Sequence, residues 1–482
     1  MRCLTGVALV VLSAALPGIA AAQTTGRVVP SPAPSGAAAA LFPGLRASYD
    51  GLVANTTRQT GAIDVLTSKD GEVYLDFSPS QLDGTYLLST TLASGVGGYG
   101  VAQGQVAGER VIRFKRVNNR ILVIEPNLHF DAPPNTPQAE SLAASVGDYS
   151  VWMALPIAAE NERTKHVVLN ASAFTGDFDN IGQHISTTLV GGHIVAGNYR
   201  LDPGRSYIEF AKAFEKNVTL AAAQTFTGTG APGLSAADPS SLLLHVRYNI
   251  TALPPPSNYE PRYADDRIGF FTESYKRFGA GREGIVDRSY VVRWDLSKGP
   301  IVFYLTREIP AEYRDTVRRA LMTWNDAFAR AGHPHAIEVL DQPNDPNWDP
   351  NDVRFNTIRW ASNDEPAFAA EGQLLDDPRT GEILHASVIL DGAAIESIRR
   401  GFRPTSAALG FADADYPSYA LDATANAAYG LLALQLLPGS RVTTDRYVRD
   451  AVFQITLHEA GHAFGLRHNF AGSTVYSLAQ LR

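Results

Sequence analysis

One stretch near the C-terminal end, from His458 to His468, limits most strongly what this chain can fold into. It has the pattern H-E-x-x-H-x-x-G-x-x-H. His458 and His462 are four residues apart, so on a helix their imidazoles project from the same face. Gly465 adopts a positive φ without steric cost, which ends such a helix and turns the chain back. The stretch therefore predicts a helix, a sharp reversal, and three imidazoles close together.

Three imidazoles in this arrangement are typical of a metal site that does chemistry. They leave the fourth tetrahedral position of a zinc ion open to water, as catalytic rather than structural zinc sites do. Glu459 follows the first histidine and reaches that water without binding the metal, which is the place of a general base. A core helix with chance histidines would not explain the glycine and the third histidine. We therefore predict Zn²⁺ as cofactor, with His458, His462 and His468 as ligands and Glu459 as catalytic residue.

Length and composition indicate a multi-domain globular protein. The chain of 482 residues is longer than one ordinary domain, so two or three are expected. Its 45% hydrophobic and 19% charged residues are typical of folded proteins. The net charge of −8 gives no reason to expect nucleic acid as a partner.

The first residues have the pattern of an export signal. Arg2 precedes an apolar run from Val7 to Leu16, and the small residues Ala20–Ala22 follow it. This predicts a Sec-type signal peptide over residues 1–22, with the protein in the periplasm or the extracellular medium. The apolar run is too short to cross a bilayer, so no membrane span is expected. The only cysteine, Cys3, lies before the run, which disfavours lipidation and leaves the mature chain without disulfides.

The rest of the chain divides by pattern into a linker and two regions. Residues 23–47 are rich in Pro, Ala and Ser, which is typical of a linker. Residues 48–293 have mostly strand patterns, including a hairpin at Asn118–Asn119. From residue 294 strands and helices are mixed, so the predicted fold class is α+β. Pro310 begins a long helix with an apolar stripe, and Thr444 or Asp445 caps the helix that carries the histidines.

Three stretches resemble a known family: Tyr259–Phe271, Asp377–Ile383 and His458–Phe470. The last matches the signature of the metzincin zinc peptidases. All three resemble large exported bacterial zinc metalloproteases with a β-rich N-terminal region of unknown function. The resemblance implies a catalytic domain over residues 294–482, with a mixed sheet, a long helix and a zinc helix. It also implies that the strand Leu384–Leu390 is the sheet edge that pairs with an extended peptide substrate.

The sequence departs from the metzincin pattern after the third histidine. Metzincins have a methionine-bearing turn there, which lies beneath the metal. Here 14 residues follow His468, and the methionines are Met1, Met153 and Met322. We therefore expect a C-terminally truncated, incomplete catalytic domain.

The function predicted from these features is an exported zinc-dependent endopeptidase acting on peptides or proteins. Zinc lowers the pKa of water, and Glu459 takes the proton as the water attacks the scissile carbonyl. The alternatives are an inactive zinc-binding or scaffold protein that acts through its β-rich region, and a zinc hydrolase of non-peptide substrates. Two segments are left open: Tyr259–Phe271 is a turn or lies across the active-site cleft, and Phe174–Asp177 is a β-turn or an aspartate that blocks the zinc. The oligomeric state is not predicted.

Overall fold

The computed structural model describes residues 48–96, 101–187, 189–190, 193–194, 197–230, 234, 236–255, 259–265, 267, 269–279, 284–363, 366, 368, 370–401, 419–468, 477 and 479–480. The predicted signal peptide and linker lie outside these residues. Residues 46–482 form one compact unit. Within the described part, no helix has the length and apolar character needed to cross a membrane.

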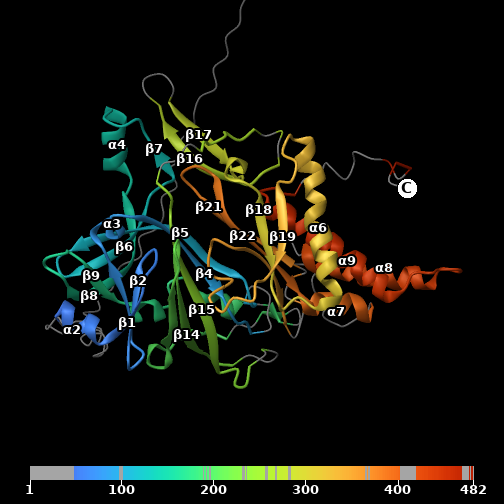
Figure 1. The fold of residues 1–482 in the computed structure, drawn as a ribbon, viewed down its shortest axis with the longest axis horizontal. Coiled ribbons are helices and arrows are strands. Elements are labelled where there is room, and N and C mark those ends of the chain that lie inside the picture. The colour runs from blue at the N-terminus through green and yellow to red at the C-terminus, as the bar shows by residue number, and fades with distance from the viewer. Residues whose placement is uncertain are drawn as a thin grey trace, which may run out of the picture. The chain divides into compact units, whose positions relative to one another are not determined.

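The first region is dominated by one large antiparallel sheet, as its strand patterns predict (Figure 1). The β5–β6 hairpin turns at Asn118, whose φ of 53° confirms the predicted asparagine turn. The sheet's 12 strands pair in the order β1 (Thr56–Gln59), β2 (Asp64–Ser68), β3 (Val73–Phe77), β9 (Val167–Asn170), β8 (Tyr149–Glu160), β6 (Arg120–Pro126), β5 (Val106–Val117), β4 (Thr85–Leu92), β15 (Ser241–Ala252), β14 (Asn217–Thr227) and β12 (Arg200–Leu201), with β13 (Tyr207–Ala213) also paired to β14.

Smaller elements surround this sheet. The short helices are α2 (Tyr49–Ala54), α3 (Pro79–Leu82), α4 (Pro137–Ser145) and α5 (Ile181–Thr187), and β10 (Leu189–Val190) pairs with β11 (His193–Ile194). A three-stranded sheet consists of β17 (Ile285–Val291), β16 (Thr272–Phe278) and β7 (Phe130–Asp131). Because β7 and β16 are far apart in sequence, this sheet joins the end of the first region to its earlier part.

The second region has a mixed five-stranded sheet and long helices, which confirms the predicted mixture of strands and helices. The strands pair in the order β19 (Ile337–Asp341), β18 (Ile301–Leu305), β20 (Asn356–Ala361), β22 (Glu382–Asp391) and β21 (Ala370–Asp377). The first four are parallel, and β21 is antiparallel. The helices are α6 (Ala311–Arg330), α7 (Gly392–Arg400), α8 (Tyr419–Leu436) and α9 (Thr444–Ala463).

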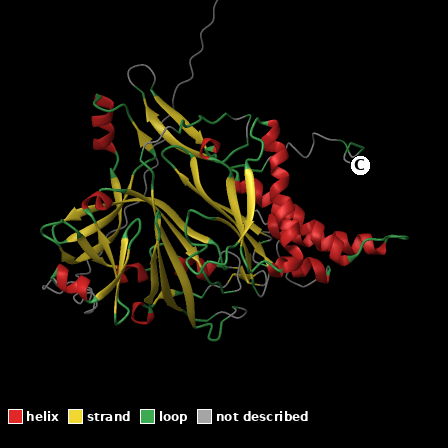
Figure 2. Cartoon of the chain, viewed as in Figure 1, coloured by secondary structure: helices red, strands yellow, loops and turns green. Residues whose placement is uncertain are grey.

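Helices α6, α7 and α9 pack against one face of this sheet (Figure 2). The apolar stripe of α6 includes Val317 and Leu321, which are fully buried with Val448 and Val452 of α9. The stripe predicted from sequence is therefore confirmed. The cap of α9 is Thr443, one residue before the predicted Thr444, because the Thr443 side chain accepts the Arg446 N–H.

The prediction of the edge strand was wrong. Leu384–Leu390 lies within β22, between β20 and β21, and the edge beside the helix α9 is β21. The chain reverses between β21 and β22 at residues 378–381, where the Gly381 N–H donates to the Asp377 carbonyl. Residues 370–377 have little apolar alternation, so their strand character depends on pairing with β22 rather than on a local pattern.

The other face of the five-stranded sheet lies against the large sheet. Leu375 of β21 packs with Leu87 and Val111, and Ile389 of β22 packs with Ala102. The Gln373 side chain also donates a hydrogen bond to the Gly104 carbonyl. The two sheets thus share buried contacts. The domain limit at residues 293/294 stays a prediction.

Candidate metal centre

Helix α9 positions the first two histidines. His458 and His462 lie on the same side of the helix, with ring centroids 4.9 Å apart, and both are half-buried. The opposite side is fixed in the core, where Ala460 is fully buried and the Trp324 Nε1–H donates to the Leu457 carbonyl at 2.9 Å. The rings therefore project from a helix that is fixed behind them.

Gly465 creates the reversal that brings in the third histidine. Its φ is +90°, and a Cβ there would lie 2.2 Å from the Val292 carbonyl oxygen, so no other residue fits. The Gly465 N–H donates to the His462 carbonyl at 2.8 Å and closes the turn. The exposed His468 then lies against both helical histidines, with Nε2–Nε2 distances of 3.0 Å to His458 and 3.1 Å to His462.

These three nitrogens fit a zinc ion. Tetrahedral Zn–N bonds of about 2.0–2.1 Å place ligand nitrogens roughly 3.3 Å apart, close to the spacing here. The His462 Nδ1 lies 2.7 Å from the Leu466 carbonyl, so Nδ1 carries the proton and Nε2 keeps its lone pair for a metal. Burial, and then the charges of His462 and His468, together lower the pKa of His458 to about 4. The lowered pKa values of His458 and His462 favour the neutral imidazole, the form that binds metal.

Glu459 is held by the edge strand. Its Oε2 accepts the Gly372 backbone N–H at 3.1 Å. The pKa of Glu459 is raised to about 7. Burial is the largest cause of this rise, the Gly372 hydrogen bond opposes it, and the charge of Glu371 adds to it. A carboxyl whose pKa lies near neutrality both takes up and releases protons under ordinary conditions. The predicted general base is thus beside the histidines and fixed in orientation.

Gly372 was missed in the sequence, although it controls how closely β21 approaches α9. A Cβ at this position would lie 2.6 Å from the Glu459 carbonyl oxygen and 3.1 Å from His462 Cβ. The edge strand can therefore lie against the helix only with glycine here. A glycine within a strand is a known sign of close backbone approach, but the sequence did not reveal that this stretch was a strand.

A segment from before the predicted domain limit completes the surroundings of the histidines. The Phe271 N–H donates to the Gly465 carbonyl at 2.8 Å, and the Arg467 N–H donates to the Gly269 carbonyl at 3.0 Å. The Phe271 ring lies 5.8 Å from the His462 ring. The final residues of Tyr259–Phe271 therefore pair with the chain between the second and third histidines, and their position across an active-site cleft stays a prediction.

Comparisons with known proteins agree with this geometry. Residues 440–482 match the family model described as Met-zincin, and residues 104–299 match a domain of unknown function, DUF5117. No curated protein and no solved structure gave a significant match. The Met-zincin match and the histidine triad together support a metzincin-like zinc site at this end of the chain.

The other candidate residues lie outside the triad. Among the residues that the structure describes, His458, His462 and His468 alone form a group able to hold a metal ion. Asp177 accepts the backbone N–H groups of Ile181 and Gly182 at 2.6 and 3.0 Å, so it caps α5. The burial of His385 lowers its pKa to about 4, as for a packed strand histidine.

Proposed function

We propose that this chain is an exported zinc-dependent endopeptidase. The observation that carries the proposal is the position of Glu459, which follows His458 on α9 and has its carboxylate held by the edge strand. A site that only stored metal would have no need of a carboxylate held there with its pKa near 7. The Met-zincin match supports the general class of metallopeptidases.

We assign each of these residues a role in peptide hydrolysis. A zinc ion held by His458, His462 and His468 would supply charge that polarises the scissile carbonyl and acidifies water. Glu459 takes the proton from the attacking water and then gives it to the leaving amine. The Gly372 N–H keeps Oε2 of Glu459 in place and leaves Oε1 to take the proton.

Strand β21 offers a place for an extended peptide. The Gly372 N–H points to Glu459 rather than to β22, so the backbone groups of Gly372 and Leu374 lie on the outer side of β21. A peptide added along this edge makes main-chain hydrogen bonds whatever its sequence. This geometry favours a peptide over a small non-peptide substrate.

Metal content and cleavage, measured together, test the proposal. We expect one zinc per purified chain and cleavage of casein or fluorogenic peptides. Glu459→Gln should keep the zinc and lose about 10²–10⁴-fold in rate. Glu338→Gln, the same change on exposed β19, is the matched control and should remain active. Zinc without cleavage would favour a zinc-binding or scaffold protein, and absence of zinc would overturn the proposal.

Export is part of the same proposal and is supported by the sequence of residues 1–22. Expression of the full chain with fractionation and N-terminal sequencing tests it. We expect the protein outside the cytoplasm with a new N-terminus near Gln23, whereas uncleaved protein in the cytoplasm would contradict export.

A further inference from the structure

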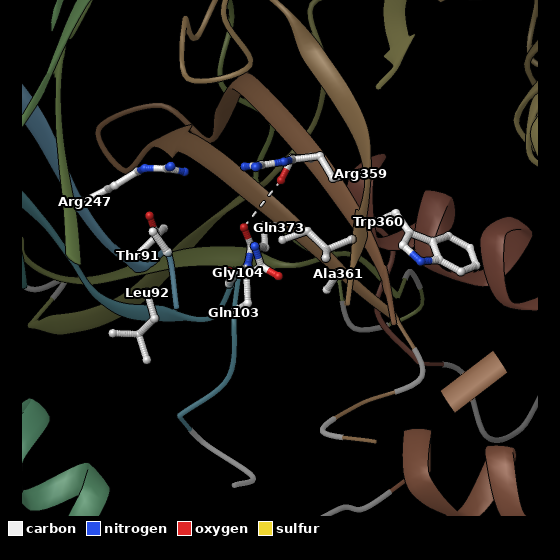
Figure 3. Close-up of a pocket in the computed structure, with 12 residues that line it drawn as sticks. Thr91, Leu92, Gln103, Gly104, Arg247, Arg359, Trp360, Ala361 and Gln373 are labelled. Atoms are coloured by element: carbon white, nitrogen blue, oxygen red, sulfur yellow. Dashed lines mark hydrogen bonds between the residues drawn. The ribbon is translucent and has the colours of Figure 1, made fainter. Parts of the chain in front are cut away.

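A small cavity lies between the two sheets, on the face of the five-stranded sheet opposite the helices (Figure 3). Its volume is about 50 Å³, which exceeds the roughly 10–15 Å³ that one water molecule needs. The polar side chains lining it belong to β4, the segment after it, β15 and the strands β20–β22: Thr91, Gln103, Arg247, Arg359, Gln373 and Ser387. Both regions of the chain therefore contribute polar side chains to this partly open space.

Two guanidinium groups face each other across this cavity. Arg247 extends from β15 of the large sheet, and Arg359 extends toward it from β20 (Figure 3). Burial lowers the pKa of Arg247, and the charge of Arg359 lowers it further. Arginine does not lose its proton in proteins, so this repulsion persists unless a negative charge offsets it.

The carboxylates near this pair are already engaged elsewhere. Within the described residues, the Arg359 guanidinium has no hydrogen-bond or ion-pair partner. The Arg247 guanidinium has only a long 3.5 Å contact with Asn351 Oδ1. The acidic groups that act on Arg247 are Asp349, which pairs with Lys212 at 2.9 Å, and Glu209, which pairs with His245 at 2.8 Å. The described residues thus supply no carboxylate as counter-ion to the two guanidiniums.

Gln373 and Ser387 pair with other groups of the chain and leave the two arginines as the charged donors. The Gln373 amide donates to the Gly104 carbonyl, and its oxygen accepts the Ser387 hydroxyl at 3.4 Å, so Gln373 is already occupied on both sides. No carboxylate lines the cavity. Guanidinium groups bind phosphate and carboxylate oxygens with paired, charge-assisted hydrogen bonds.

We propose that this cavity is a binding site for a small free oxyanion, of the size of phosphate or sulfate, held by Arg247 and Arg359. The limited volume of about 50 Å³ favours a small free ion over a segment of polymer. Because Arg247 belongs to the large sheet and Arg359 to the five-stranded sheet, the ion would join the two. Its effect is therefore on the stability of their contact, independently of any peptidase activity.

Calorimetric titration and thermal unfolding of the full chain test this site. We expect saturable binding of one inorganic phosphate per chain and a rise in Tm of several °C, compared with sodium chloride of equal ionic strength. Sulfate should compete with phosphate. Arg359→Gln should abolish both effects and, by removing the repulsion, should unfold no earlier than the unliganded wild type. Arg441→Gln, at an exposed position, is the matched control and should bind as the wild type does.

Two further outcomes decide the proposal. Arg359→Lys keeps the charge but not the forked donor, so it should bind phosphate at least about tenfold more weakly than the wild type. This variant keeps the test informative if Arg359→Gln fails to fold. Absence of saturable binding to the wild type at millimolar phosphate would overturn the proposal. An equal rise in Tm for wild type and Arg359→Gln would also overturn it, because the effect would then be one of salt on the whole chain.

Discussion

Replacing Gly372 with alanine would separate the edge strand from the helix that carries the histidines. The added Cβ would lie 2.6 Å from the Glu459 carbonyl oxygen, where ordinary contact begins at 3.4 Å. The neighbouring atom is helix backbone, which cannot rotate away. The strand must therefore move by about 0.8 Å, close to the roughly 1 Å misplacement that costs 10²-fold in rate.

The same movement lengthens the hydrogen bond from Gly372 to Glu459, now 3.1 Å. Overpacking of this kind costs about 1–3 kcal/mol. The expected result is a rate of peptide cleavage about 10²-fold lower, together with a Tm lower by a few °C. The three histidines do not contact the new methyl group except at His462 Cβ, so zinc content should stay at one per chain.

The assay compares kcat/KM on a fluorogenic peptide, Tm and zinc content for wild type and Gly372→Ala. Gly147→Ala is the matched control, because a Cβ at Gly147 meets no atom within 4 Å. It should match the wild type in all three measurements. Full activity and an unchanged Tm in Gly372→Ala would refute the close approach of β21 to α9. Loss of zinc would instead indicate that the strand supports the ligands themselves.

Three other predictions follow from the structure. Removal of metal with EDTA should lower Tm, and added zinc should restore it. The free energy of unfolding should fall by about 4 kcal/mol if free zinc was at a thousandfold excess over Kd. An unchanged calorimetric Tm would contradict a folded metal site. Burial, and then the negative charges of Glu273 and Asp377, raise the pKa of Asp376 from 3.8 to about 7. The free energy of unfolding should therefore fall as pH rises through that range, because Asp376 must ionise in the folded protein. Asp376→Asn should therefore raise Tm at pH 8 and leave it unchanged at pH 4; an equal effect at both would show that charge is not the cause. Trp324→Phe removes the 2.9 Å hydrogen bond to the Leu457 carbonyl and should cost roughly 1 kcal/mol in urea unfolding, and no loss would show that water replaces the indole.

Local patterns predicted the elements that lie within a single stretch of chain. The stripe from Val317 to Leu321 in α6 and the turn at Asn118 depend on residues a few positions apart. The same is true of His458, His462 and Gly465, whose spacing fixes one helix face and its end. The assignment of helices, hairpin and metal-binding residues therefore needed no knowledge of distant parts of the chain.

Strand β21 illustrates what a local pattern does not contain. Its residues have no clear alternation, and Gly372 disfavours a strand when judged alone. Pairing with β22 makes it a strand, and close approach to α9 makes glycine necessary. The sequence instead suggested Leu384–Leu390 as the edge, because an apolar run indicates a buried strand but not its neighbours.

The sequence by itself determined the chemistry of the metal site: three imidazoles and a carboxylate at fixed offsets on one helix and its turn. Only the tertiary structure decided what surrounds them, including the Gly372 N–H on Glu459, the Phe271 ring beside His462 and the pair Arg247–Arg359. The physical reason is the range of the interactions. Helix periodicity and φ preferences act over a few residues, whereas sheet order and packing join segments far apart in the chain, such as Gly372 and Glu459, which are 87 residues apart.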